Sequence, residues 1–145
     1  MWPAILAAGA LSLANLALLA LAATGLTRLL PPLVRRVAVR APFWGGAAAL
    51  GTALLALLVA GVAQIALWAG AFVLCGEFAD FEEAFYHSAV NFTTLGYGDI
   101  VMSRRRGLLG PLEAANGSLM LGLSAAMLFT VLSRVAKLRA PRSDR

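Results

Sequence analysis

Charged side chains are scarce in this sequence, and their scarcity decides the class of protein. Only 13% of the 145 residues are charged, whereas 61% are hydrophobic. A soluble domain carries about 25% charged residues. No polar stretch is long enough to fold a separate soluble domain, so we expect neither an enzyme active site nor a cofactor. The sequence therefore predicts an integral membrane protein with a single domain.

Cysteine and histidine are almost absent as well. The single cysteine, Cys75, has no intrachain partner for a disulfide, and we expect it to pack as a small apolar side chain. The single histidine, His87, is a pH sensor or a packed residue, and we favour the packed residue.

Three long runs contain no charged residue: Met1–Thr27, Ala41–Gly76 and Ala114–Ser133. Each is close to or longer than the roughly 20 apolar residues that cross a bilayer. A fourth uncharged run, Ala84–Gly98, is too short to cross and suits a re-entrant helix and loop. Irregular backbone at membrane depth is tolerated only inside protein or beside a water-filled cavity. We therefore predict an all-α membrane protein with three transmembrane helices and one re-entrant segment.

The basic side chains flank these runs. Arginines 28, 35, 36 and 40 lie between the first two runs, and Arg134, Lys137, Arg139, Arg142 and Arg145 follow the last one. The positive-inside rule places both groups in the cytoplasm, with the amino terminus outside and the carboxyl terminus inside. Because these residues flank spans instead of covering a folded polar face, we reject a nucleic-acid partner.

The intervening stretch supports that orientation because its acids outnumber its bases. The acids are Glu77, Asp80, Glu82, Glu83, Asp99 and Glu113, and the bases are Arg104, Arg105 and Arg106. We assign this stretch to the outer face and expect the three arginines to form a solvated turn that pairs with neighbouring acids.

Residues 93–99 read Thr-Thr-Leu-Gly-Tyr-Gly-Asp and form the most informative motif. Gly96 and Gly98 can adopt positive φ without a Cβ clash. Backbone carbonyls presented in this way, with the Thr94 hydroxyl, can replace the water shell of K⁺. The motif resembles the selectivity filter of the potassium-channel superfamily, whose usual form is Thr-Val-Gly-Tyr-Gly-Asp, in its two-transmembrane pore-loop type.

The resemblance implies a K⁺-selective channel and assigns roles to the motif. The K⁺ ligands are the Thr94 hydroxyl and carbonyl and the carbonyls of Leu95, Gly96 and Tyr97, and Gly98 completes the filter. Thr93, Asp99 and Tyr86 support it: Asp99 lies at the outer mouth, Tyr86 is placed to bond Asp99, and the Tyr97 side chain braces the filter against the pore helix. Each chain holds one filter copy, and K⁺ needs about eight oxygens in two four-fold layers, so the assembly is expected to be a homotetramer.

The helices on either side of the filter take further roles. Asp80 is the predicted N-cap of a pore helix that ends near Phe92, with Glu83 completing a capping box. In the inner helix, Gly117 and Gly122 are candidate hinges for opening, or sites of close helix packing. When residues are counted in steps of four from Gly117, one face of the inner helix carries Ala125, Phe129 and Ser133. Phe129 forms an apolar gate on this face, or else faces lipid or a neighbouring helix.

The chain divides into three parts. Residues 1–45 form an extra amino-terminal transmembrane helix and a basic connector, residues 46–136 the pore domain, and residues 137–145 a short basic tail. Residues 4–27 are expected to be an outer, lipid-facing helix that Pro31 and Pro32 end. Since its start lacks the positive segment of a signal peptide, we expect the helix to be retained.

Several alternatives stay open. Leu95 replaces the usual β-branched residue, which leaves a weakly selective cation pore as the runner-up. A membrane anchor or accessory subunit that conducts nothing is the alternative from another class. An uptake transporter is disfavoured because such relatives carry four filter repeats, and voltage sensing because no regularly spaced arginine helix is present. The expected partners are membrane lipids and an unidentified regulatory subunit. The expected permeant ion is K⁺, and the expected location is a bacterial inner membrane.

Overall fold

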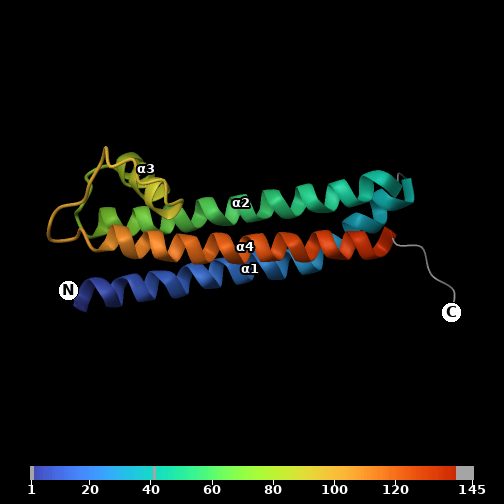
Figure 1. The fold of residues 1–145 in the computed structure, drawn as a ribbon, viewed down its shortest axis with the longest axis horizontal. Coiled ribbons are helices and arrows are strands. Elements are labelled where there is room, and N and C mark those ends of the chain that lie inside the picture. Colours follow the sequence, from blue (N-terminus) through green and yellow to red (C-terminus); the bar gives the residue numbers. More distant parts are fainter. Residues whose placement is uncertain (1, 41, 140–145) are drawn as a thin grey trace.

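A computed structural model describes residues 2–40 and 42–139, and every regular element in them is an α-helix. The helices are α1 (Trp2–Arg40), α2 (Pro42–Leu74), α3 (Phe81–Phe92) and α4 (Leu109–Arg139). The three long helices lie side by side along the long axis, and the short α3 lies against α2 at one end (Figure 1).

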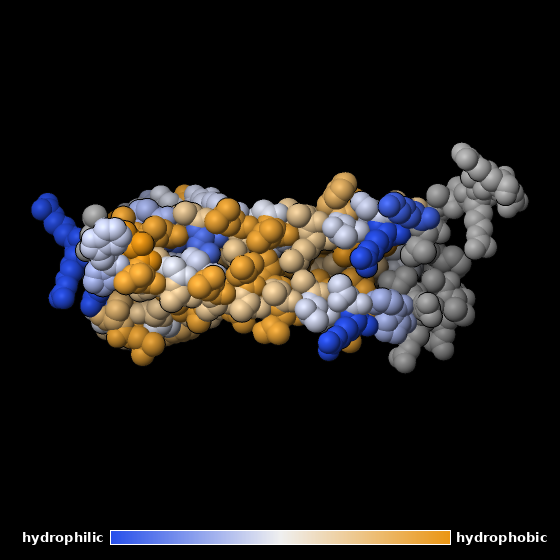
Figure 2. Space-filling view, turned by 90° about the horizontal axis from the view of Figure 1, so that it is seen from below, coloured by the Kyte–Doolittle hydropathy of each residue, from blue (hydrophilic) through white to orange (hydrophobic). Residues whose placement is uncertain are grey.

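Each long helix contains a segment that is long and apolar enough to cross a membrane. These segments are Trp2–Pro32, Trp44–Leu74 and Leu109–Lys137. The 31 residues of the first extend about 46 Å at 1.5 Å per residue, which exceeds the roughly 30 Å hydrocarbon core. Apolar side chains cover most of the surface between two more hydrophilic ends (Figure 2). The predicted all-α fold with three membrane-capable helices is confirmed.

The two ends of the bundle carry different parts of the chain. The start of α1, the α3 helix and the loop after it lie at one end, and the α1–α2 junction and the end of α4 lie at the other (Figure 1). We call these the α3 end and the junction end. Both basic groups of the sequence flank the junction end as far as they fall within the described residues, whereas residues 140–145 of the tail lie outside them. The fold is therefore consistent with the charge argument that puts both groups on one side.

The helix break expected at Pro31 and Pro32 is wrong. Helix α1 continues through both prolines to Arg40, so the proposed connector is helical as far as Arg40. Proline fixes φ near −65°, which a helix accepts, and its cost is one lost backbone hydrogen bond together with its ring's clash with the preceding turn. Helices in membranes tolerate these losses where neighbouring groups compensate.

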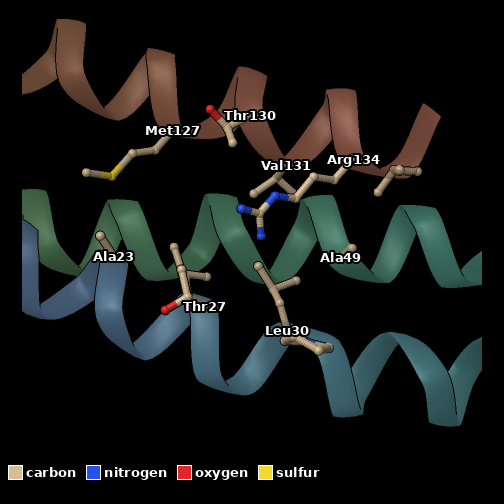
Figure 3. A pocket seen from close by; sticks show the side chains of 11 residues that line it. Ala23, Thr27, Leu30, Ala49, Met127, Thr130, Val131 and Arg134 are labelled. Atoms are coloured by element: carbon tan, nitrogen blue, oxygen red, sulfur yellow. The ribbon is translucent and has the colours of Figure 1, made fainter. Parts of the chain in front are cut away.

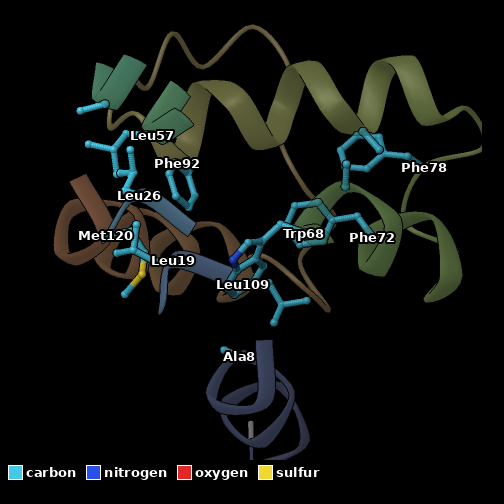
Figure 4. Packing of buried hydrophobic residues seen from close by; sticks show 13 residues of the cluster. Ala8, Leu19, Leu26, Leu57, Trp68, Phe72, Phe78, Phe92, Leu109 and Met120 are labelled. Atoms are coloured by element: carbon cyan, nitrogen blue, oxygen red, sulfur yellow. The ribbon is translucent and has the colours of Figure 1, made fainter. Parts of the chain in front are cut away.

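Helix α1 packs one face against the other two long helices, whereas its opposite face, which includes Leu13, is exposed. Its Ala8, Asn15, Leu19 and Leu26 are buried, and it contacts both α2 and α4. The buried cluster draws on all four helices and includes Trp68, Phe72 and Phe92 (Figure 4). The exposed face is consistent with the lipid-facing helix that the sequence suggested, and the buried face joins α1 to the protomer's core.

A buried polar network joins the three long helices. The Asn15 side-chain amide donates to Asn116 Oδ1 at 2.7 Å, and Trp68 Nε1 lies 3.4 Å from the same oxygen. Gln64 Nε2 donates to the backbone carbonyl of Asn15 at 3.0 Å. Polar side chains inside a bilayer pair with one another because lipid supplies no partner. These bonds fix α1 in register against α2 and α4.

Candidate functional site

The backbone of the 93–99 segment alternates in handedness. Thr94, Gly96 and Gly98 have φ of 60°, 61° and 72°. The positive φ predicted for the two glycines is confirmed, whereas that of Thr94 was not foreseen. Thr94 is the one non-glycine residue with positive φ in the part of the chain that the structure describes. Such a conformation costs about 1–3 kcal/mol and persists only where the surroundings impose it.

This alternation determines where the carbonyl groups point. Consecutive residues of opposite handedness turn their peptide groups to one side, whereas an extended strand alternates them. The segment from Thr94 to Gly98 can therefore present a row of backbone oxygens along one edge. Residues 93–99 are all exposed in the protomer, so this edge is open to an ion or to further copies of the chain.

Hydrogen bonds from the segment to the end of α3 hold it in place. Thr93 donates to Ala89 O from both its backbone nitrogen, at 3.1 Å, and its hydroxyl, at 2.7 Å. The backbone nitrogens of Leu95 and Gly96 donate to Val90 O at 2.9 and 3.3 Å. The last carbonyls of a helix have no partner within it, and here the segment supplies one. The backbone N–H groups at the start of the segment, from Thr93 to Gly96, are used in this way.

Helix α3 starts where the sequence placed it, but without the predicted cap. Asp80 occupies the N-cap position with extended backbone, yet its side chain makes no capping hydrogen bond. The capping box with Glu83 is therefore wrong. Glu82 and Glu83 lie exposed in the first turn, where water solvates them and the helix dipole favours their charge.

Tyr86 and Asp99 meet beside the segment, as expected. The Tyr86 hydroxyl donates to Asp99 Oδ2 at 2.6 Å. This hydrogen bond favours the charged carboxylate, so it holds the pKa of Asp99 below its usual value and raises the pKa of the Tyr86 phenol. Tyr97 is 67% exposed, so the brace expected from its side chain is not made within one protomer.

His87 is packed behind the segment. Its ring lies 5.0 Å from that of Phe78 and 5.8 Å from that of Phe72. Asn91 Nδ2 lies 2.7 Å from Nε2, and the Ile100 carbonyl lies 3.1 Å from Nδ1. An amide NH₂ only donates and a carbonyl only accepts, which assigns the proton to Nδ1 of a neutral ring. Burial lowers the pKa of His87, in agreement with the packed histidine that we expected.

Glu77, just beyond α2, anchors the loop that follows the segment. Its carboxylate accepts hydrogen bonds from the backbone nitrogen of Ser103, from the Ser103 hydroxyl at 2.9 Å and from Arg106 Nη1 at 3.1 Å. Burial alone raises the pKa of Glu77, but these bonds and the arginine charge more than offset it, and the net pKa is lowered. The expected pairing of the outer arginines with acids is thus realised by Arg106.

Gly117 brings the inner helix α4 into direct contact with the end of α3. A Cβ at this position would lie 2.0 Å from the Phe92 carbonyl oxygen, which no side chain can occupy. A Cβ at Gly122 would meet nothing within 4 Å. Close packing therefore explains Gly117, and the choice of Gly117 as reference for the pore-lining face was wrong, because it faces α3.

The residues proposed for the gate lie on a different face of α4. Ala125 is exposed, Phe129 is 69% exposed and Ser133 is half-buried. Phe129 follows Gly117 by twelve residues, which at about 100° per residue places it roughly a third of a turn away. In the protomer this face is therefore free of the contact that fixes Gly117.

Glu113 is absent from the outer surface to which the sequence assigned it. The side chain is fully buried and lies 2.5 Å from Ser88 Oγ. The outer stretch still contains more acids than bases without it. Its burial follows from its position one turn into α4, on the side that packs against α3.

An apolar pocket of about 420 Å³ lies toward the junction end, away from the 93–99 segment. The Arg134 side chain reaches into it between α1 and α4 (Figure 3). Its other lining residues are Ala23, Leu26, Thr27, Leu30, Pro31, Ala49, Met127, Thr130, Val131 and Val135.

Comparison with protein families gave one match for this chain. A family model described as an ion channel matches residues 53–134, which is more than half of the chain and falls within the segment predicted to form a pore. Comparison with curated proteins and with solved structures gave no match.

Proposed function

Because the chain belongs to the ion channel family, we propose that it is a potassium-selective channel that conducts K⁺ passively and without a cofactor. The observation that carries this proposal is the alternating backbone at Thr94, Gly96 and Gly98. Alternation of this kind supports a row of inward-facing carbonyls, which is the ligand set that replaces the hydration shell of K⁺.

The proposed ion ligands are the Thr94 hydroxyl and the carbonyls of Thr94, Leu95, Gly96 and Tyr97. The left-handed φ of Thr94 supports its inclusion, since the strain there serves no purpose in an ordinary turn. Asp99 adds negative potential at the outer mouth, and its bond from Tyr86 fixes the side chain against the pore helix.

The proposed assembly is a closed ring of four copies. One protomer supplies one oxygen to each layer, and K⁺ requires about four oxygens per layer. The exposure of the whole 93–99 segment supports this, because an isolated filter strand leaves its ligands without a cage. We propose that the α3 end, which includes the amino terminus, faces outward and that the junction end lies in the cytoplasm.

The test is ion flux from liposomes that contain the purified protein. An outward K⁺ gradient is expected to drive flux that an equal Na⁺ gradient does not, and bi-ionic recordings are expected to give a strongly K⁺-selective reversal potential. Near-equal permeability supports instead the weakly selective cation pore, for which the unbranched Cβ of Leu95 is the specific argument. No flux of either ion favours an anchor or accessory subunit.

A matched pair of glycine variants makes the flux test specific to the filter. Gly96→Ala places a Cβ on a residue with φ of 61° and is expected to abolish K⁺ selectivity, because left-handed backbone costs an L-residue about 1–2 kcal/mol. Gly51→Ala lies in α2 with nothing within 4 Å and is expected to conduct normally. Equal, unaltered selectivity in both variants contradicts the filter assignment.

A further inference from the structure

Glu113 lies one turn into the membrane-capable span of α4, buried among the helices, where an ionised carboxylate is costly. It is fully buried, and its Oε2 has no hydrogen-bond partner among the described residues. No charged group acts on it from the helices packed around it. His87, the titratable neighbour of Ser88 on α3, bonds Ile100 and Asn91 instead. Among the described residues, a single hydrogen bond from Ser88 would be all that offsets the desolvation of an ionised Glu113.

The hydrogen-bond count at Ser88 shows where a proton must be. Ser88 Oγ lies 2.9 Å from the Ile65 carbonyl of α2 and 2.5 Å from Glu113 Oε1 of α4. A serine hydroxyl has one hydrogen, so it donates to one of these two oxygens only. A backbone carbonyl has no proton to give. Both contacts are hydrogen bonds only if Glu113 carries a proton and donates it to Ser88.

We propose that Glu113 is a neutral carboxylic acid that fastens the inner helix to the pore helix by donating its proton to Ser88. The chain of donors runs from Glu113 Oε1 to Ser88 Oγ and from Ser88 Oγ to Ile65 O. It joins α4, α3 and α2 with one proton per bond, and it leaves Oε2 as the carbonyl oxygen of an acid.

Glu113 is thereby a positioning residue for the candidate filter. Ser88 lies two residues before Val90, whose carbonyl accepts the backbone N–H groups of Leu95 and Gly96. A shift of α3 at Ser88 therefore shifts the start of the filter. This consequence for conduction depends on the proposed function, whereas the protonation state of Glu113 does not.

Infrared spectroscopy of the full chain in lipid tests the proton directly. The wild-type protein at neutral pH is expected to show the C=O stretching band of a protonated carboxylic acid, which moves in ²H₂O and is missing in Glu113→Gln. Glu83→Gln is the matched control, because Glu83 is an exposed carboxylate, and it is expected to keep the band. A wild-type spectrum with carboxylate bands only overturns the proposal.

A second variant keeps the test decisive if Glu113→Gln fails to fold. Ser88→Ala removes the acceptor and is expected to move the band to higher frequency, because a free acid group has a stiffer C=O bond. A band that stays unmoved in Ser88→Ala shows that Glu113 does not donate to Ser88 and overturns the assignment.

Thermal stability and flux supply a readout of the positioning role. Raising the pH until the band disappears is expected to lower the melting temperature of the wild type and of Glu83→Gln, but not of Glu113→Gln, whose amide NH₂ still donates to Ser88. Equal alkaline destabilisation of all three contradicts the proposal. If the spectra agree but no variant, the wild type included, passes K⁺, the proposed function fails and the neutral acid stands.

Discussion

Replacing Gly117 by alanine is expected to destabilise the protein, against the usual effect of alanine in a helix. Alanine stabilises a helix interior by about 0.8–1 kcal/mol relative to glycine. At this position the new Cβ would lie 2.0 Å from the Phe92 carbonyl oxygen, 2.7 Å from its carbonyl carbon and 2.8 Å from its Cα. These are backbone atoms, so no rotamer change relieves the contact and the two helices must separate.

The balance of the two effects decides the sign. Overpacking typically costs about 1–3 kcal/mol, and a clash with backbone belongs at the upper end of this range. After the helix-propensity gain is subtracted, we expect a net loss of about 1–2 kcal/mol. The displaced Phe92 directly precedes Thr93, so K⁺ flux is expected to fall with stability.

Thermal unfolding in detergent, followed by circular dichroism, measures the stability change, and liposome flux measures conduction. Gly122→Ala is the matched control, because a Cβ there meets nothing within 4 Å and alanine is expected to leave stability unchanged or raise it by up to about 1 kcal/mol. If Gly117→Ala is as stable as Gly122→Ala, the close contact between α4 and the end of α3 does not exist in solution.

Three further predictions follow from the hydrogen bonds and exposure of single residues. The hydrogen bond from Tyr86 holds the pKa of Asp99 below its usual value, so its contribution to stability is present above the unfolded pKa and is lost as the pH falls through the folded pKa. Tyr86→Phe is therefore expected to move the acid limit of K⁺ flux to higher pH, and an unmoved limit contradicts this role. Asn15→Leu removes the bond to Asn116 and is expected to lower stability by about 0.6–1.7 kcal/mol in thermal unfolding, with no loss rejecting a structural role for the network. Phe129→Ala is expected to raise the resting K⁺ leak without changing selectivity, whereas an unchanged leak in liposomes means that Phe129 faces lipid.

The parts of the fold that follow from local chemistry could be predicted from the sequence. Charge-free runs determine where helices can cross lipid, and the three spans follow from them. Positive φ could be predicted at Gly96 and Gly98 because only glycine adopts it freely. The hydrogen bond between Tyr86 and Asp99 could be predicted from the motif and the position of the pore helix.

The parts that depend on neighbouring helices could not be predicted. Threonine is β-branched, so nothing in the sequence signals left-handed backbone at Thr94; the bonds from Leu95 and Gly96 to α3 impose it. Pro31 and Pro32 are helix breakers in isolation, yet α1 passes through them. The sequence places Glu113 among the surface acids, because nothing in it shows that α3 covers this side chain.

Three residues of α4 that contact neighbouring helices show where this helix is free to bend. Glu113, Asn116 and Gly117 lie within five positions of one another and contact α3, α1 and α3 again. A bend at Gly117, or between Gly117 and the start of α4, has to break these contacts in an environment without water. Further toward the end of α4, a Cβ at Gly122 would meet nothing within 4 Å, so the helix has space to move there. The part of α4 up to Gly117 is therefore expected to act as a fixed support for the 93–99 segment, and the part that carries Phe129 is expected to swing about Gly122.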